Sequence, residues 1–149
     1  MSSEPMTNTH QHHTIPSDRF GQWAPKILGI TRILTGIMFA SHGAQKVLGA
    51  FGGMPPGAPA WIVWIAGPIE LVGGILIALG LFTRSTAFLC SGLMAVAYFY
   101  GHARGGFLPK VNGGESAVLY CWLFLYIAAA GGGAWALDNL LRRRGRTNS

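Results

Sequence analysis

Charged side chains are scarce in this chain of 149 residues: they make up 11% of it, and only five of them are Asp or Glu. Soluble globular domains carry about 25% charged residues, so this sequence cannot cover a water-facing surface of the usual kind. Hydrophobic residues make up 50% of the chain, and its mean hydropathy is +0.37. Most of the folded surface must therefore face something other than water.

Cysteine is also rare, and the common catalytic motifs are absent. The two cysteines, Cys90 and Cys121, are expected on the order of 10–15 Å apart in depth, which is too far for a disulfide. There is no CxxC, phosphate-binding loop, dinucleotide fingerprint, nucleophile elbow or HExxH. His10, His12 and His13 form one short tract without fixed geometry, so we expect incidental metal binding at most and predict no metal site.

Long apolar stretches are what the chain has in their place. They cover residues 25–48, 61–82, 85–100 and 117–134. A bilayer core of about 30 Å needs ~20 helical residues, and only helices satisfy the backbone of such a stretch in hydrocarbon. Three consecutive glycines at 131–133 predict a break, followed by an amphipathic segment at 135–141. The predicted fold is all-α: a polytopic four-transmembrane-helix bundle with a short C-terminal interfacial helix.

The distribution of basic residues predicts the topology. Seven lie on one side (Arg19, Lys26, Arg84 and the four C-terminal arginines) and three on the other (Lys46, Arg104, Lys110). By the positive-inside rule, both termini are cytoplasmic. We expect residues 1–22 to be a disordered cytoplasmic tail, 23–141 one membrane domain and 142–149 a basic cytoplasmic tail. These basic residues flank spans and form no aromatic-interleaved patch, so lipid headgroups are the expected partner and nucleic acid is not.

Glu70 is the sharpest functional signal. It lies near the middle of the second apolar stretch, where an acid costs roughly 2.5–3.5 kcal/mol on insertion scales. It must therefore face the bundle and find a partner, or stay protonated. Pro68, two residues earlier, cannot donate to the carbonyl of Trp64 and loosens the helix there. A functional polar site and a charge pair that only locks two helices are the two interpretations.

The first stretch supplies the expected partners of Glu70. Antiparallel packing puts Glu70 at a depth between Arg32 and His42, so these three residues form the candidate catalytic site. A histidine beside a carboxylate titrates near neutral pH and could pass protons or polarise a quinone carbonyl. Lys46, His102 and Arg104 are candidate substrate-binding residues near the outer side, with headgroup contact as the alternative. Tyr120 is expected to be interfacial packing. No cofactor motif is present, and a quinone is the candidate cofactor.

With these residues in place, the sequence resembles the DoxX family of bacterial integral membrane proteins over about residues 25–141. The likeness rests on short motifs: Arg32-Ile-Leu-Thr-Gly, His42-Gly-Ala-Gln-Lys, Glu70-Leu-Val-Gly-Gly, Gly80-Leu-Phe-Thr-Arg and Trp135-Ala-Leu-Asp. The resemblance implies a four-helix protein of the bacterial inner membrane. Family names point to redox chemistry, among them a subunit of thiosulfate:quinone oxidoreductase and membrane partners of oxidative-stress enzymes. The missing CxxC argues against a direct thiol mechanism.

Three hypotheses follow. The first is a small membrane subunit of a redox or quinone-linked complex, with soluble or membrane redox proteins as partners and a polar site at Glu70, Arg32 and His42. The second is a carrier for a small solute that uses the same site. The third is a structural membrane partner whose charges only fix helix packing. The sequence leaves open whether the chain is an enzyme.

Overall fold

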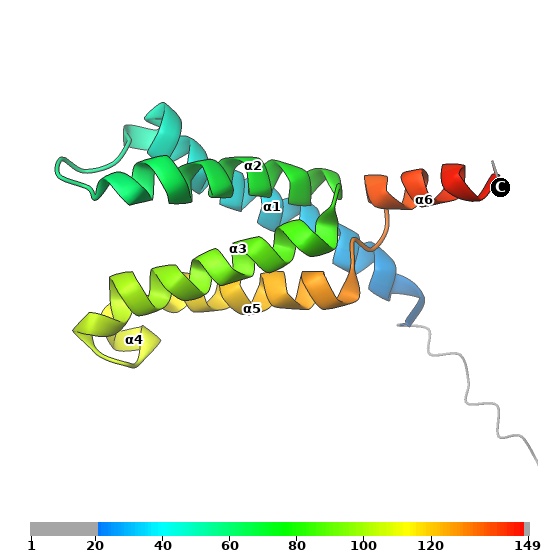
Figure 1. Ribbon diagram of the computed structural model, residues 1–149. Helices are drawn as coiled ribbons and strands as arrows, with labels where there is room; N and C mark the ends of the chain where they lie inside the picture. The colour runs from blue at the N-terminus through cyan, green and yellow to red at the C-terminus, as the bar shows by residue number, and fades with distance from the viewer. Residues whose placement is uncertain (1–20, 148–149) are drawn as a thin grey trace, which may run out of the picture.

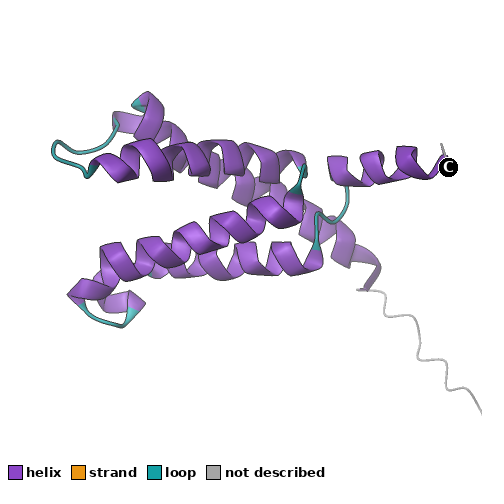
Figure 2. Ribbon diagram, viewed as in Figure 1, coloured by secondary structure: helices purple, strands orange, loops and turns teal. Residues whose placement is uncertain are grey.

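The computed structural model describes residues 21–147, and within that range every regular element is a helix (Figure 2). The α-helices are α1 (Ala24–Leu48), α2 (Gly67–Leu79), α3 (Thr83–Ala97), α4 (Pro109–Asn112), α5 (Glu115–Ala130) and α6 (Leu137–Thr147). Two π-helical segments, η3 (Ile62–Ala66) and η4 (Tyr98–His102), adjoin α2 and α3. The short 3₁₀ segments are Gly21–Trp23, Ala50–Gly52 and Ala103–Gly105. The expected N-terminal tail, with its histidines, falls almost wholly outside the described residues.

Two of these helices are long and apolar enough to cross a bilayer: Gly21–Leu48, with 28 residues, and Ile62–Leu79, with 18. A third, Glu115–Ala130, is apolar but shorter. The second span is continuous because η3 accommodates Pro68: the cap N–H of Gly67 reaches back to the carbonyl of Ile62. The loosening that Pro68 predicts is therefore confirmed as a π-helical turn.

The helices form two antiparallel hairpins, α1 with α2 and α3 with α5 (Figure 1). Glycine makes the first one close. A Cβ on Gly36 would lie 2.6 Å from the carbonyl oxygen of Gly74, and a Cβ on Gly74 would lie 2.4 Å from the amide nitrogen of Ala40. Only residues without a side chain allow the backbones to approach this far. Phe39 of α1 then packs against Phe124 of α5, with ring centroids 4.6 Å apart, and joins the two hairpins.

Figure 1 shows the hairpins close together at one end and spread apart toward α4. We call the first the closed end, formed by the turn 80–82, the loop 131–136 and the start of α6. We call the other the open end, formed by the connector 49–61 and the segment 98–114. α5 ends at Ala130, so the break expected at the three glycines is confirmed. α6 runs on through Thr147, including residues expected as a tail, and continues beyond the closed end in Figure 1.

Arg32 ties the closed end together. Its side chain is fully buried, and its guanidinium donates to the carbonyls of Ile77 (2.7 Å) and Ala78 (2.5 Å) at the end of α2. It also donates to the carbonyls of Gly132 (2.7 Å) and Ala134 (3.4 Å) in the loop after α5. The last carbonyls of a helix have no intrahelical donor and carry partial negative charge. Arg32 therefore joins the end of α2 to the loop after α5 through four carbonyls, one of which, that of Ile77, also accepts from the amide of Gly80 at 3.0 Å.

Asp138 does the converse for the start of α3. Its carboxylate accepts from the amides of Phe82 (2.8 Å) and Thr83 (2.9 Å), while its own amide donates to Gly80 (2.9 Å). Partial burial acts to raise the pKa of Asp138, but the hydrogen bonds from Thr83 and Phe82 and the charge of Arg32 outweigh it, so its pKa lies below the ordinary value. The carboxylate thus caps α3 from a helix distant in sequence.

Asp138→Ala is expected to destabilise the chain by on the order of 1 kcal/mol, the typical cost of a lost N-terminal cap. Because the folded pKa is depressed, this stabilisation is complete above the unfolded pKa of about 4 and disappears as the pH falls through the lower folded pKa. Thermal unfolding in detergent at several pH values should show the stabilities of the unsubstituted protein and Asp138→Ala becoming equal only below that pH window. Asp138→Asn keeps one acceptor oxygen, so it should lose less stability than Asp138→Ala. Equal losses of stability in the two variants would contradict the capping role.

Candidate functional site

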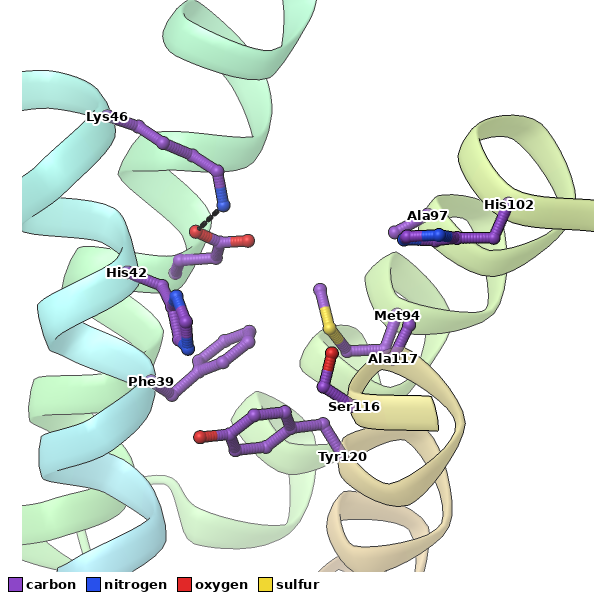
Figure 3. A pocket seen from close by; sticks show the side chains of 10 residues that line it. Phe39, His42, Lys46, Met94, Ala97, His102, Ser116, Ala117 and Tyr120 are labelled. Atoms are coloured by element: carbon purple, nitrogen blue, oxygen red, sulfur yellow. Dashed lines mark hydrogen bonds and ion pairs between the residues drawn. The ribbon is translucent and has the colours of Figure 1, made fainter. Parts of the chain in front are cut away.

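A pocket lies between the two hairpins on the open-end side of Phe39 (Figure 3). Its volume is about 150 Å³. Each of the four long helical segments contributes to the wall: Phe39, His42 and Lys46 from α1, Glu70 from α2, Met94 and Ala97 from α3, His102 from η4, and Ser116, Ala117 and Tyr120 from α5. The pocket is therefore formed by both hairpins together, and its lining combines aromatic rings with several polar groups.

Glu70 and Lys46 form an ion pair at one wall of this pocket, drawn as the dashed line in Figure 3. Lys46 Nζ donates to Glu70 Oε2. Glu70 is 4% exposed, whereas the Lys46 side chain keeps 16% of its surface. The expected inward position of Glu70 is thus found, with Lys46 as the partner. A paired carboxylate in a pocket can hold a polar ligand atom through its second oxygen.

Two histidines face this pocket from opposite hairpins. His42 lies on α1, one turn before Lys46, and its ring meets that of Tyr120 edge-on at 6.1 Å between centroids. His102 lies on η4, with Nδ1 3.2 Å from the carbonyl oxygen of Asn112. Its ring points into the pocket in Figure 3. The predicted residues Glu70, His42, Lys46 and His102 therefore line one site.

Tyr120 is a pocket residue that sequence reasoning assigned to interfacial packing. Its ring stacks on Phe124 at 5.7 Å and lies 5.5 Å from Phe39. Its hydroxyl is buried and has no hydrogen-bond partner among residues 21–147. A buried hydroxyl without a partner costs free energy, and this one has almost no accessible surface, so Tyr120 offers the pocket its ring and not its hydroxyl. The available signal was its position one turn into the fourth apolar stretch.

Arg32 and Arg104 lie outside the pocket, which corrects two of the predicted site assignments. Arg32 bonds to carbonyls at the closed end, and Ala78 of α2, not Glu70, stands opposite it. The reason is the α1–α2 register, which pairs Lys46 with Glu70 and Gly36 with Gly74. Arg104 stacks its guanidinium over the ring of Tyr100 at 4.9 Å. Neither arginine can take part in chemistry at Glu70 in this arrangement.

The described residues include no cluster of three or more His, Cys, Asp or Glu side chains that could hold a metal ion. The two cysteines are free; Cys90 is buried, and Cys121 receives a hydrogen bond at its carbonyl from the hydroxyl of Ser91 at 2.8 Å. Neither cysteine lines the pocket. The polar groups that the pocket offers a ligand are therefore the carboxylate, the ammonium, two imidazoles and the hydroxyl of Ser116.

Comparison with protein families gives one match, to the family described as DoxX, over residues 27–103. This range contains most of α1 and all of α2, α3 and η4, and so all of the pocket except the part contributed by α5. The match includes the ion pair and both histidines of the site.

Related proteins cover most of the chain. An uncharacterized protein of Haemophilus influenzae is 46% identical over 79% of this chain and 92% of its own length. Inner membrane protein YqjF of Escherichia coli is 29% identical over 77% of this chain and 92% of its own length. A Bacillus subtilis protein named "Putative oxidoreductase CatD" is 29% identical over 73% of this chain and 82% of its own length. No solved structure matches the chain.

Proposed function

This chain belongs to the DoxX family of membrane proteins, and we propose that it is a small subunit of a redox or quinone-linked complex of the bacterial inner membrane, with a ligand site in the pocket between its hairpins. One related protein is named an inner membrane protein and another an oxidoreductase. Both names agree with this proposal.

The observation that carries the proposal is the size and lining of the pocket. A pocket of about 150 Å³ has the volume of a core cavity that holds a single benzene ring, and because it is open on one side, substituents on the ring can extend out of it. Phe39 and Tyr120 offer aromatic faces, while Glu70, His42 and His102 offer polar atoms from different sides. A one-ring compound with oxygen atoms at its edge, as in a quinone head group, satisfies both kinds of wall.

Purification in a mild detergent tests this function. Quinones should be present in the organic extract of the protein, and titration with tetramethyl-1,4-benzoquinone or its reduced form should saturate at one ring per chain. Tyr120→Leu removes one aromatic face of the pocket and should weaken binding about fivefold. Tyr100→Leu is the control, because Tyr100 lies outside the pocket. Failure of both forms to bind would refute the proposal and leave a solute carrier or a structural partner.

The proposed complex also requires a partner. Cross-linking in native membranes, followed by purification, should recover a redox protein in fixed ratio to this chain. Transport of a small solute into proteoliposomes, without any such partner, would favour the carrier hypothesis instead.

For the topology, we propose four spans formed by α1, η3 with α2, α3 with η4, and α5, with both termini in the cytoplasm. Support comes from the basic residues: Arg84, Lys26 and the arginines of α6 gather at the closed end, and Lys46, Arg104 and Lys110 at the open end. Reporter fusions at residue 147 and within 104–112 should give opposite sidedness, with residue 147 inside. A C-terminus outside the cytoplasm would contradict this topology, and with it the opening of the pocket toward the outer side.

A further inference from the structure

We propose that the pocket prefers a ring bearing hydroxyl groups over the same ring bearing carbonyls, so that it binds a hydroquinone more tightly than the corresponding quinone. This inference rests on the proposed function, because it concerns the ligand of the same pocket. It comes from counting which pocket groups can only accept a hydrogen bond and which can also donate one.

His102 is an acceptor toward the pocket. Its Nδ1 lies 3.2 Å from the carbonyl oxygen of Asn112, and a carbonyl oxygen can only accept, so Nδ1 carries the proton. The side chain of Asn112 is itself held in place: its Nδ2 donates to the carbonyl of Gly106 at 2.6 Å, and its Oδ1 accepts from the backbone amide of Gly114 at 2.8 Å. In its neutral form the imidazole therefore presents the lone pair of Nε2, and the ring points into the pocket in Figure 3.

Glu70 is a second acceptor. Lys46 occupies Oε2, and Oε1 has no partner among the described residues. Glu70 lines the pocket from α2, and α3, η4 and α5 supply the opposite wall. An ionised carboxylate accepts hydrogen bonds and donates none. Two acceptors from opposite hairpins thus face the same small volume.

The hydrogen-bond donors of the pocket do not reverse this preference for a ligand hydroxyl over a ligand carbonyl. The remaining protons of Lys46, the N–H of His42 and the hydroxyl of Ser116 can donate, but a ligand hydroxyl can also accept from them. A hydroxyl can also donate to Glu70 or His102, which a carbonyl cannot. A quinone would leave buried acceptors without partners, and an unsatisfied buried group costs affinity. A dihydroxy ring satisfies acceptors and donors together.

Three ligands with the same tetramethylated ring test the inference on the full-length protein in detergent under anaerobic conditions. They are tetramethylhydroquinone, tetramethyl-1,4-benzoquinone and 1,4-dimethoxytetramethylbenzene; the quinone is fully substituted, which blocks addition of thiols or amines at the ring. We expect the hydroquinone to bind at least about tenfold more tightly than either of the others. A tenfold preference for the reduced form raises the two-electron midpoint potential of the bound ring by about 30 mV.

His102→Leu should reduce the preference toward equality, because it removes one acceptor, whereas Tyr100→Phe should leave it unchanged. If the quinone binds as tightly as the hydroquinone or more tightly, the inference is wrong while the proposed function survives. Binding of none of the three rings overturns both. Equal binding of the hydroquinone and its dimethyl ether also overturns the inference, because the ether lacks the hydroxyl hydrogens and carries two additional methyl groups.

Discussion

Glu70→Gln is expected to abolish cellular function in a deletion strain while the purified chain stays folded. The substitution replaces one of the two carboxylate acceptors with an NH₂ donor and leaves the ammonium of Lys46 without its counter-charge. Breaking a fully buried pair costs roughly 3–5 kcal/mol in soluble proteins. Lys46 keeps some exposure at the pocket wall and membrane interactions are often weaker than expected, so we expect about 1–2 kcal/mol. Complementation and thermal unfolding in detergent measure the two effects.

The chain offers a matched control for this experiment. Lys110 and Glu115 form a second ion pair, at 4.0 Å, whose side chains are 86% and 57% exposed. Exposed pairs contribute about 0–1 kcal/mol, so Glu115→Gln should change neither stability nor complementation measurably. Equal effects of Glu70→Gln and Glu115→Gln would show that burial in the pocket gives the first pair no special role.

The double variant Lys46→Gln with Glu70→Gln separates a functional pair from a structural lock. It removes both charges, so the stability lost in the single variant should return in either case. If the pair only holds α1 against α2, function returns as well. If Glu70 contacts a ligand, function stays lost. Recovery of both properties would therefore defeat the functional interpretation and leave the structural one.

The partner of Glu70 is Lys46, where the sequence predicted Arg32 or His42, and this difference shows what the sequence could and could not predict. The four apolar stretches, the helix break at 131–133 and the inward position of Glu70 all follow from hydropathy and from the cost of a buried charge. The partner of Glu70 does not, because it depends on the register of α1 against α2. The connector 49–61 is long and leaves that register free. Contacts of Gly36 and Gly43 with α2 backbone fix it instead.

Tyr120 illustrates a second limit. α5 is apolar on nearly all sides: Leu119, Trp122 and Tyr126 are exposed while Phe124 and Ile127 are buried. In lipid, both the outer surface and the core are apolar, so periodicity does not reveal which face of such a helix points inward. A tyrosine on α5 could therefore be assigned to the pocket only once the rotation of the helix was known.

Arg32→Lys is expected to give the largest loss of stability of any single substitution considered for this chain, although it conserves charge. The guanidinium donates to carbonyls at the end of α2 and in the loop after α5 simultaneously. An ammonium is a compact donor and cannot reproduce that fork. Hydrogen bonds to charged groups contribute about 1.5–3 kcal/mol each, and several are lost or distorted together. We expect destabilisation of about 3 kcal/mol or more, measured by thermal unfolding in detergent.

The effect of Arg32→Lys on the pocket decides the role of this residue. Arg32 acts at the closed end, whereas the pocket residues lie on the open-end side of Phe39. At a temperature where the variant remains folded, its affinity for the quinone or hydroquinone ring should therefore stay within about twofold of the affinity of the unsubstituted protein, since the effects of distant sites are close to additive. Arg104→Lys, at an exposed site over Tyr100, should alter neither quantity. A stable Arg32→Lys protein that no longer binds the ring would reverse the assignment and return Arg32 to the functional site.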